Sequence, residues 1–390
     1  MTHWPVFADD ERAAAMRVLE SGRVNYWTGT EGRAFETDFA AYTGAAHAVA
    51  LANGTVALEL ALHALGVGPG DEVIVPARTF VGTATAVVAR GARPVVADVD
   101  ATSGNLSADT ITAALTEHTR CVIPVHIGGW PCDMDTIMAL ADARGILVVE
   151  DCAQAHGARW NGRAVGTFGH IGAFSFCQDK IMTTAGEGGM LITNDDELYL
   201  RAWEYKDHGR SAAAMERAAA AGGREFKYIV GSFGTNWRMT EVQAAIGRVQ
   251  LTKLDEWVET RRANAEALER ELACTPGLRI PAVPEGAYHS YYKYYAYIDP
   301  ALLRQGWTRT RILDEVTSRG VPCMQGTCCE IYREKAFVDA GLSPSERLPA
   351  AAALGDTALM LLVDPTLGTD DMKRTADVLR EVMMEATGGA

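Results

Sequence analysis

GAFSFCQDKIMTTAGEGGMLITN, residues 172–194, is the stretch from which the fold of this 390-residue sequence can be argued. It begins with an apolar and aromatic run, 173–176, and ends with a second strand-like run, 190–193. The loop between the two runs carries Lys180 and three glycines, which permit positive φ and close approach of the backbone to a ligand. A lysine beside such a loop can react with a carbonyl group when it is partly desolvated. The alternative is a surface lysine in a β-turn.

A carboxylate upstream of this loop favours the reactive lysine. Asp151 follows the continuous β-branched run 146–149 and Glu150, a pattern that predicts a strand of a parallel sheet covered on both faces. Open α/β sheets bind ligands at the carboxyl ends of such strands. Asp151 is either a helix cap or, paired with Lys180, part of a pyridoxal phosphate (PLP) site. PLP needs a lysine for its Schiff base and a carboxylate that keeps its ring nitrogen protonated.

Three ordered motifs carry a resemblance to a known family: EDCAQAHG at 150–157, FSF with the following Lys180, and GEGG at 186–189. They resemble the DegT/DnrJ/EryC1/StrS family of fold-type I PLP enzymes, which are mostly sugar aminotransferases. The resemblance extends from about residue 26 to beyond residue 251, with a looser match to the C-terminus. It implies an α/β fold in which a large PLP-binding domain, 26–254, holds a mainly parallel sheet of the seven-stranded type flanked by helices. A small α+β domain would follow at 255–390, with residues 1–25 packed nearby.

The same resemblance implies roles for individual residues. Lys180 would form the Schiff base and then act as general acid and base, and Asp151 would hold the pyridinium. Gln154 would contact the phenolic oxygen, and Phe80 would stack on the ring or else be a core residue at a helix start. The residues expected to hold the phosphate are Gly54, Thr55, Ser175 and, from a second subunit, Asn236, which is otherwise a helix cap. His156 would orient cofactor or substrate, or be a core histidine satisfied by backbone.

Two departures from the family pattern concern the substrate. Lys293 stands where many members carry a histidine, and 321–332 (VPCMQGTCCEIY) replaces a His-Tyr-Pro-like segment. The second change is more typical of branches that act on cyclitols or amino-shikimate-type rings, whereas Lys293 is either a phosphate or carboxylate contact or a solvated lysine. The expected substrate-contacting residues are Tyr26, Arg238, Lys293 and Tyr332.

The expected activity is transfer of an amino group from glutamate or glutamine to a keto-sugar, nucleotide-activated, in amino-sugar or secondary-metabolite biosynthesis. The alternative acceptor is a cyclitol or amino-shikimate-type ring ketone. A PLP-dependent sugar dehydratase is a weaker alternative, because in such relatives histidine replaces the lysine and Lys180 is present. A non-catalytic regulatory homologue would need a broken site, whereas all the cofactor residues stand in place.

Bulk composition excludes several other classes. A net charge of −14 argues against nucleic acid or an anionic membrane as the main partner. The N-terminus lacks the pattern of a secretory signal and there is no apolar run of 18 residues, so we expect a cytoplasmic enzyme. The eight cysteines form no CxxC pair, and we expect no metal.

Four further expectations concern local structure. A helix is expected to begin at 78–80 and run to Gly91, and a single aromatic strand to span 288–297. The Ala-rich segment 211–223 is low in complexity and predicts a mobile excursion. The loop 234–239, GTNWRM, is expected to cross a homodimer interface and complete the partner's site, as in relatives. Aromatic residues that look exposed in the sequence would support that interface; they are Tyr26, Trp27, Trp237 and Tyr291.

Overall fold

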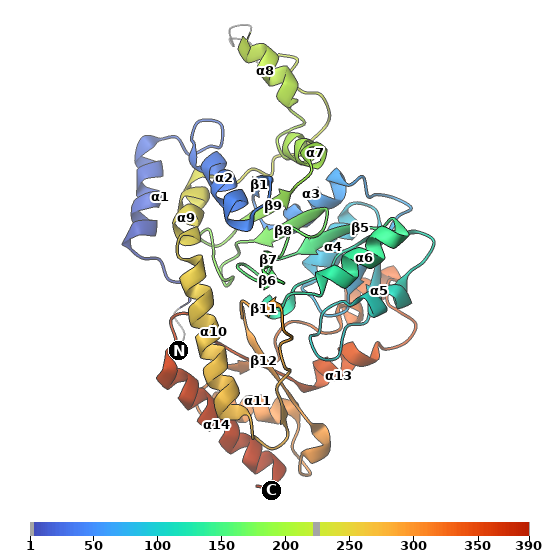
Figure 1. Cartoon of the computed structure of the whole chain (residues 1–390), viewed down its shortest axis with the longest axis vertical. Helices are drawn as coiled ribbons and strands as arrows, with labels where there is room; N and C mark the ends of the chain where they lie inside the picture. The colour runs from blue at the N-terminus through green and yellow to red at the C-terminus, as the bar shows by residue number, and fades with distance from the viewer. Residues whose placement is uncertain (1–3, 221–226, 390) are drawn as a thin grey trace.

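The computed structural model describes residues 4–220 and 227–389, and its centre is a seven-stranded sheet in the order β1-β9-β8-β5-β4-β2-β3 (Figure 1). Strands β3, β2, β4, β5 and β8 pair in parallel, whereas β9 runs antiparallel to β8 and β1. The strands are β1 (His47–Leu51), β2 (Glu72–Pro76), β3 (Arg93–Ala97), β4 (Thr119–Val122), β5 (Leu147–Asp151), β8 (Ile171–Ser175) and β9 (Gly189–Thr193). The expected α/β class with a mainly parallel seven-stranded sheet is confirmed.

Helices cover both faces of this sheet. Its strands are short runs of buried apolar residues, as covered parallel strands require. One face packs against α3 (Gly54–Ala64) and α4 (Gly82–Ala89), and the other against α5 (Ala108–Ala114) and α6 (Met134–Arg144). The helix α7 (Asp196–Lys206) lies beside α3 and β1.

A second sheet, in the order β10-β12-β14-β13, forms the other end of the molecule. Its strands are β10 (Leu278–Arg279), β12 (Tyr294–Ile298), β13 (Cys323–Met324) and β14 (Ala358–Leu361). The long helix α10 (Leu254–Leu272) reaches from the first sheet toward it and packs on α14 (Thr369–Thr387), which also contacts α11 (Arg309–Ser318). Between the two ends lies a small sheet of β6 (Arg159–Trp160), β7 (Arg163–Ala164) and β11 (Ala287–Tyr288).

The remaining helices cover the edges of the seven-stranded sheet. Near the N-terminus, α1 (Asp9–Ser21) and α2 (Glu31–Thr43) pack on α9 (Glu241–Leu251). Late in the chain, the segments η3 (Ile331–Arg333), α12 (Lys335–Ala340) and α13 (Pro349–Thr357) add buried side chains to the same core as α3 and α4. No helix in 4–220 or 227–389 combines the length and apolarity needed to span a membrane.

The structure corrects two of the local expectations. The helix expected from residue 78 begins at Gly82, because Arg78 and Thr79 make buried contacts to Tyr297 and Thr83 instead. The expected strand 288–297 is divided between β11 and β12, which belong to different sheets.

The segment between those two strands turns away because the Ser290 amide donates to the Gly129 carbonyl at 3.0 Å. The segment 211–223 contains the helix α8 (Ala212–Ala220), in keeping with the high helix propensity of alanine. Its last three residues lie outside the described part of the chain. In Figure 1, α8 stands out from the body beyond α7.

Candidate active site

The carboxyl end of β8 meets the N-terminus of α3 with no room to spare. A Cβ on Gly54, the first residue of α3, would lie 2.6 Å from the Ser175 Cβ, and one on Gly189 would lie 2.3 Å from the Asn53 carbonyl oxygen. Asn53 caps α3 by accepting from the Val56 amide at 3.0 Å. The glycines therefore bring the free amides of a helix N-terminus against a serine hydroxyl, which is an arrangement that binds phosphate.

Asp151 ends β5, on the same edge of the sheet. Its Oδ2 accepts from the Thr83 hydroxyl at 2.8 Å and its Oδ1 from the Ala153 amide at 3.1 Å. Burial raises the pKa of this carboxyl above its usual value, although both hydrogen bonds and the nearby Lys180 ammonium lower it in part. A cation placed against Asp151 would therefore be strongly attracted, since a buried carboxylate is otherwise poorly compensated.

The Lys180 loop is fixed from two distant parts of the chain. The Lys180 carbonyl accepts from the Trp4 indole N–H at 2.9 Å. Lys180 Nζ lies 4.9 Å from the ring centroid of Tyr292, and Lys293 Nζ lies 4.7 Å from the same centroid. The Tyr292 hydroxyl donates to the Asp179 carboxylate. One tyrosine ring thus contacts two ammonium groups and orients the residue next to Lys180.

Two other predicted residues lie in positions that suit a ring-shaped ligand. Gln154 is buried, and its Oε1 accepts from the Gly128 amide at 2.8 Å, which leaves its amide NH₂ to donate. The Phe80 side chain is 66% exposed even though α4 begins two residues later. A Cβ on Gly82 would lie within 3.2 Å of both the Phe80 ring and the Thr55 hydroxyl, so these two side chains are neighbours.

His156 lies in a different environment. Its ring is 1% exposed and packs between Phe174 and Phe176, with centroid distances of 5.6 and 5.5 Å. Successive residues of a strand face opposite sides, so these phenylalanines lie on the face opposite to Ser175. Burial, with the Lys180 and Arg261 charges, lowers the pKa of His156 to about 3. The packing is that of a core histidine, but both ring nitrogens are buried without a hydrogen-bond partner among the described residues, so the expected backbone partner is missing.

Two of the four expected substrate residues have their hydroxyls engaged inside the protein. Tyr26 donates to Glu36 at 2.9 Å and lies under the Lys206 ammonium, while Tyr332 donates to Glu330 at 2.6 Å. The expectation of exposed aromatics is wrong for Tyr26 and Tyr291, which are 1% and 8% exposed. Besides Phe80, Tyr228 and Phe233 face solvent, at 96% and 99%.

The loop 234–239 packs beside the end of β1, where the Leu51 and Arg238 backbones form an antiparallel bridge. Arg238 pairs with the Asp207 carboxylate, and the Asp207 and Asn236 backbones form an antiparallel bridge. The Asn236 side chain belongs to an exposed residue and makes none of the cap contacts of α9, whose N-cap is Thr240. Arg238 thus serves its own subunit, and Asn236 is left facing outward.

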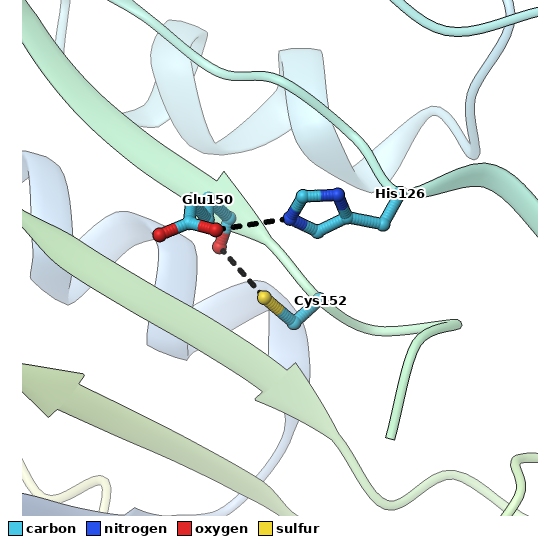
Figure 2. Close-up of side chains that lie close together, drawn as sticks. All are labelled: His126, Glu150 and Cys152. Carbon is cyan, nitrogen blue, oxygen red and sulfur yellow. Dashed lines mark hydrogen bonds and ion pairs between the residues drawn. The ribbon is translucent and has the colours of Figure 1, made fainter. Parts of the chain in front are cut away.

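A buried cluster beneath Asp151 has the composition of a metal site, and Figure 2 shows its members, His126, Glu150 and Cys152, turned toward one another. The Glu150 carboxylate accepts four hydrogen bonds, from three backbone amides of the 166–169 loop at 2.7 Å each and from His126 Nε2 at 3.1 Å. The other ring nitrogen of His126 accepts from the Cys132 amide at 2.9 Å. Both ring nitrogens of His126 and the Glu150 carboxylate are therefore occupied by hydrogen bonds. These bonds fix the end of β5, where Asp151 lies.

Sequence reasoning missed several residues that build this site. Thr83 donates to Asp151, and Tyr292 donates to Asp179 in the Lys180 loop. Trp4 binds the Lys180 carbonyl, and Glu150 binds the backbone of the 166–169 loop. Only the spacing of Thr79 and Thr83, one helical turn apart, offered a signal. The other contacts join segments more than a hundred residues apart or depend on backbone amides.

Comparisons with known proteins agree with this geometry. The model of the DegT/DnrJ/EryC1/StrS aminotransferase family matches residues 5–380. The 3-amino-5-hydroxybenzoate synthase of Amycolatopsis mediterranei is 38% identical over 90% of this chain and 86% of its own. A dTDP-3-amino-3,4,6-trideoxy-alpha-D-glucose transaminase of Streptomyces venezuelae is 36% identical over 95% and 91%. The solved structure of an aminotransferase from Psychrobacter cryohalolentis is 49% identical with a TM-score of 0.96, covering 99% of both chains.

Proposed function

This chain belongs to the DegT/DnrJ/EryC1/StrS aminotransferase family and is a transaminase, and on that premise we propose that it moves an amino group from glutamate or glutamine to a cyclic ketone at the Lys180 site. The observation that supports this site is the convergence of Lys180, Asp151 and the α3 N-terminus on one edge of the sheet.

The residues present fit pyridoxal phosphate. The close contact between Gly54 and Ser175 places the α3 amides beside a serine hydroxyl, which suits a phosphate. The exposed Phe80 ring offers a stacking face, and Asp151 is a buried carboxylate that a cation would compensate. When bound there, PLP supplies an electron sink for the bond changes at the amino-bearing carbon.

Each of the following side chains would then have a separate role in the reaction. Lys180 Nζ carries the proton between the two carbons involved in amino transfer. The Asp151 carboxylate keeps a proton on the ring nitrogen, and the Gln154 amide donates to the phenolic oxygen. Ser175, Thr55 and the α3 amides bind the phosphate.

Lys293 is the residue that bears most directly on the acceptor. Its ammonium shares the Tyr292 ring with Lys180, and burial lowers its pKa below the usual lysine value, with Lys180 and Arg261 adding to this. A phosphate or carboxylate on the substrate would raise this pKa again and favour the charged form. We propose a nucleotide-activated keto-sugar as the acceptor, as the name of the Streptomyces relative suggests.

A ring ketone of the amino-shikimate type is the second candidate. It is favoured by the 321–332 segment, which lacks the His-Tyr-Pro pattern, and by the name of the Amycolatopsis relative. The carboxylate of such a ring would suit Lys293 equally. Half-reactions of the amino-loaded enzyme with a nucleotide keto-sugar and with a keto-cyclohexene carboxylate separate the two acceptors.

We further propose a homodimer in which Asn236 of one subunit reaches the phosphate of the other, and a division of each chain into 26–254 and 255–390. The outward-facing Asn236 supports the first proposal. The division at residue 254 does not separate the cores completely. The segments η3 and α13 follow that boundary in the chain but pack with α3 and α4 rather than with the second sheet.

Borohydride reduction tests the assignment of Lys180. The reduced holoenzyme should carry the cofactor on Lys180, as peptide mass spectrometry would show, and Lys180→Ala should lose turnover while keeping its circular dichroism spectrum. Lys293→Ala is the matched control because it removes the other ammonium on Tyr292, and it should still be labelled at Lys180. An adduct on Lys206 or Lys293 would refute the assignment.

A further inference from the structure

Arg78 is a buried cation that lies two residues beyond the end of β2. Its side chain is 1% exposed, and its guanidinium carbon lies 4.4 Å from the ring centroid of Tyr295. Nη1 donates to the Tyr297 hydroxyl of β12 at 2.7 Å. Nε and Nη2 have no hydrogen-bond partner among the described residues. Two N–H-bearing nitrogens of a permanent cation are thus buried and unsatisfied.

No side chain in the described ranges supplies the missing negative charge. The groups that interact most strongly with Arg78 are the hydroxyls of Tyr297 and Tyr295 and the Cys329 thiol. Burial raises the pKa of both Tyr297 and Cys329, and Arg78 only partly opposes this, so both stay neutral near pH 7. A buried ion without a counter-ion is strongly unfavourable.

A cavity of about 20 Å³ lies against this guanidinium. Its lining includes Arg78, Ser103, Trp130 and Tyr294, and the Tyr294 hydroxyl is also buried without a hydrogen-bond partner. The space exceeds the roughly 10–15 Å³ that one water-sized occupant needs. Gly104 confines the guanidinium, since a Cβ there would lie 2.1 Å from Nη1.

One acidic residue, Glu269, also lines the cavity. It is only half-buried, and its carboxylate accepts from the Tyr291 hydroxyl at 3.1 Å. Its charge is therefore partly solvated and engaged elsewhere, whereas the unsatisfied donors of Arg78 and Tyr294 are fully enclosed.

We propose that this cavity binds one small monovalent anion of chloride size, held by Nε and Nη2 of Arg78. Arg78 follows a strand of the seven-stranded sheet and donates to Tyr297 of β12 in the other sheet. An anion that neutralises Arg78 therefore stabilises the contact between the two sheets and makes their association depend on its concentration. The site lies outside the set of residues proposed for amino transfer.

Anomalous diffraction locates the anion directly. Crystals of the holoenzyme grown in sodium bromide should show a bromide peak within about 3.5 Å of the Arg78 guanidinium. A refined water with no anomalous signal at that position would overturn the proposal.

Unfolding in solution gives an independent answer. Holoenzyme unfolding is compared in sodium chloride and in sodium gluconate, whose anion is too large for the cavity, at equal ionic strength and fixed PLP. At a chloride concentration ten times its dissociation constant, the folded-to-unfolded ratio should rise about elevenfold. Arg78→Met should abolish the rise, and such a replacement of a buried ion is often tolerated.

Arg279→Met is the matched control. Arg279 also stacks on Tyr297, at 4.5 Å, but from the solvent side. This variant should keep the full chloride response. A response of equal size in Arg78→Met, or none in the wild type, would contradict an anion at Arg78.

Discussion

Asp151 matters as a charge rather than as a shape. Asp151→Asn keeps the volume and the Thr83 bond but removes the anion opposite the ring nitrogen. Loss of an opposite charge at contact distance lowers the pKa of the partner by about 1–3 units. We therefore expect kcat for amino transfer to fall about tenfold or more, measured as single-turnover rates with a saturating amino donor.

Thr83→Val is the control for that experiment, because it removes one hydrogen bond to Asp151 and leaves the charge. It should lower the rate less than Asp151→Asn does. Near wild-type rates in Asp151→Asn would show that this carboxylate does not govern the ring.

His156 should make the fold sensitive to acid. Its folded pKa is about 3, mainly because it is buried, whereas an unfolded histidine titrates near 6.5. The unfolded state therefore binds the proton first, and the stability present above pH 6.5 is lost as the pH falls toward 3. At pH 5 the loss amounts to about 2 kcal/mol.

His156→Leu should remove this loss, which urea unfolding at pH 8 and pH 5 would measure. His118→Leu, at an exposed position, should behave as wild type. If the folded His156→Leu protein lost its turnover, His156 would have a catalytic role instead of the core role its packing indicates.

At the scale of elements, the contact between α3 and β8 sets the phosphate site. Gly54→Ala would place a Cβ 2.6 Å from that of Ser175 and push the helix N-terminus away from the serine. We expect PLP to bind about tenfold more weakly or worse, a change equivalent to about 1.4 kcal/mol. Fluorescence titration of the apoenzyme measures it.

Gly68→Ala is the comparison, since a Cβ there meets only the Arg90 carbonyl, at an ordinary 3.8 Å. Its PLP affinity should match the wild type. Equal affinities in all three proteins would remove the glycine contact from the cofactor site.

The sequence best predicts the elements whose secondary structure is determined by their own residues. The strand-like runs 173–176 and 190–193 overlap β8 and β9, because both are apolar stretches on either side of a glycine-containing loop. Lys180 and Asp151 were predicted from local motifs.

The failures are tertiary in origin. The run 288–297 was divided because Ser290 pairs with Gly129, and Arg78 delays α4 because it reaches Tyr297. The sequence could not show that Glu150 fixes the end of β5, since three of the four hydrogen bonds that its carboxylate accepts come from backbone amides. Hydrogen bonds donated by backbone amides cannot be predicted from the pattern of side chains in the sequence.

At the scale of the whole molecule, the prediction is that active sites are shared between two subunits. Lys180→Ala removes the reactive amine, and Asn236→Asp would place a carboxylate against the partner's phosphate. Arg238 is left intact because it pairs with Asp207 in its own subunit. Each homodimer should be inactive.

Mixing equal amounts under conditions that exchange subunits should restore about a quarter of the wild-type activity. Half of the dimers are then mixed, and one of the two sites in each is intact. Native mass spectrometry confirms the exchange. Full exchange with no recovery, or an active monomer by light scattering, would contradict shared sites.

The bridge between Asp207 and Asn236 has a consequence for engineering. The chain leaves the body and returns to it at one point, so everything from 208 to 235 is topologically an insert. Its length is therefore decoupled from the register of β1 and β9, and it can be exchanged between relatives as a cassette. Such an exchange would leave the sheet that leads to Lys180 unchanged.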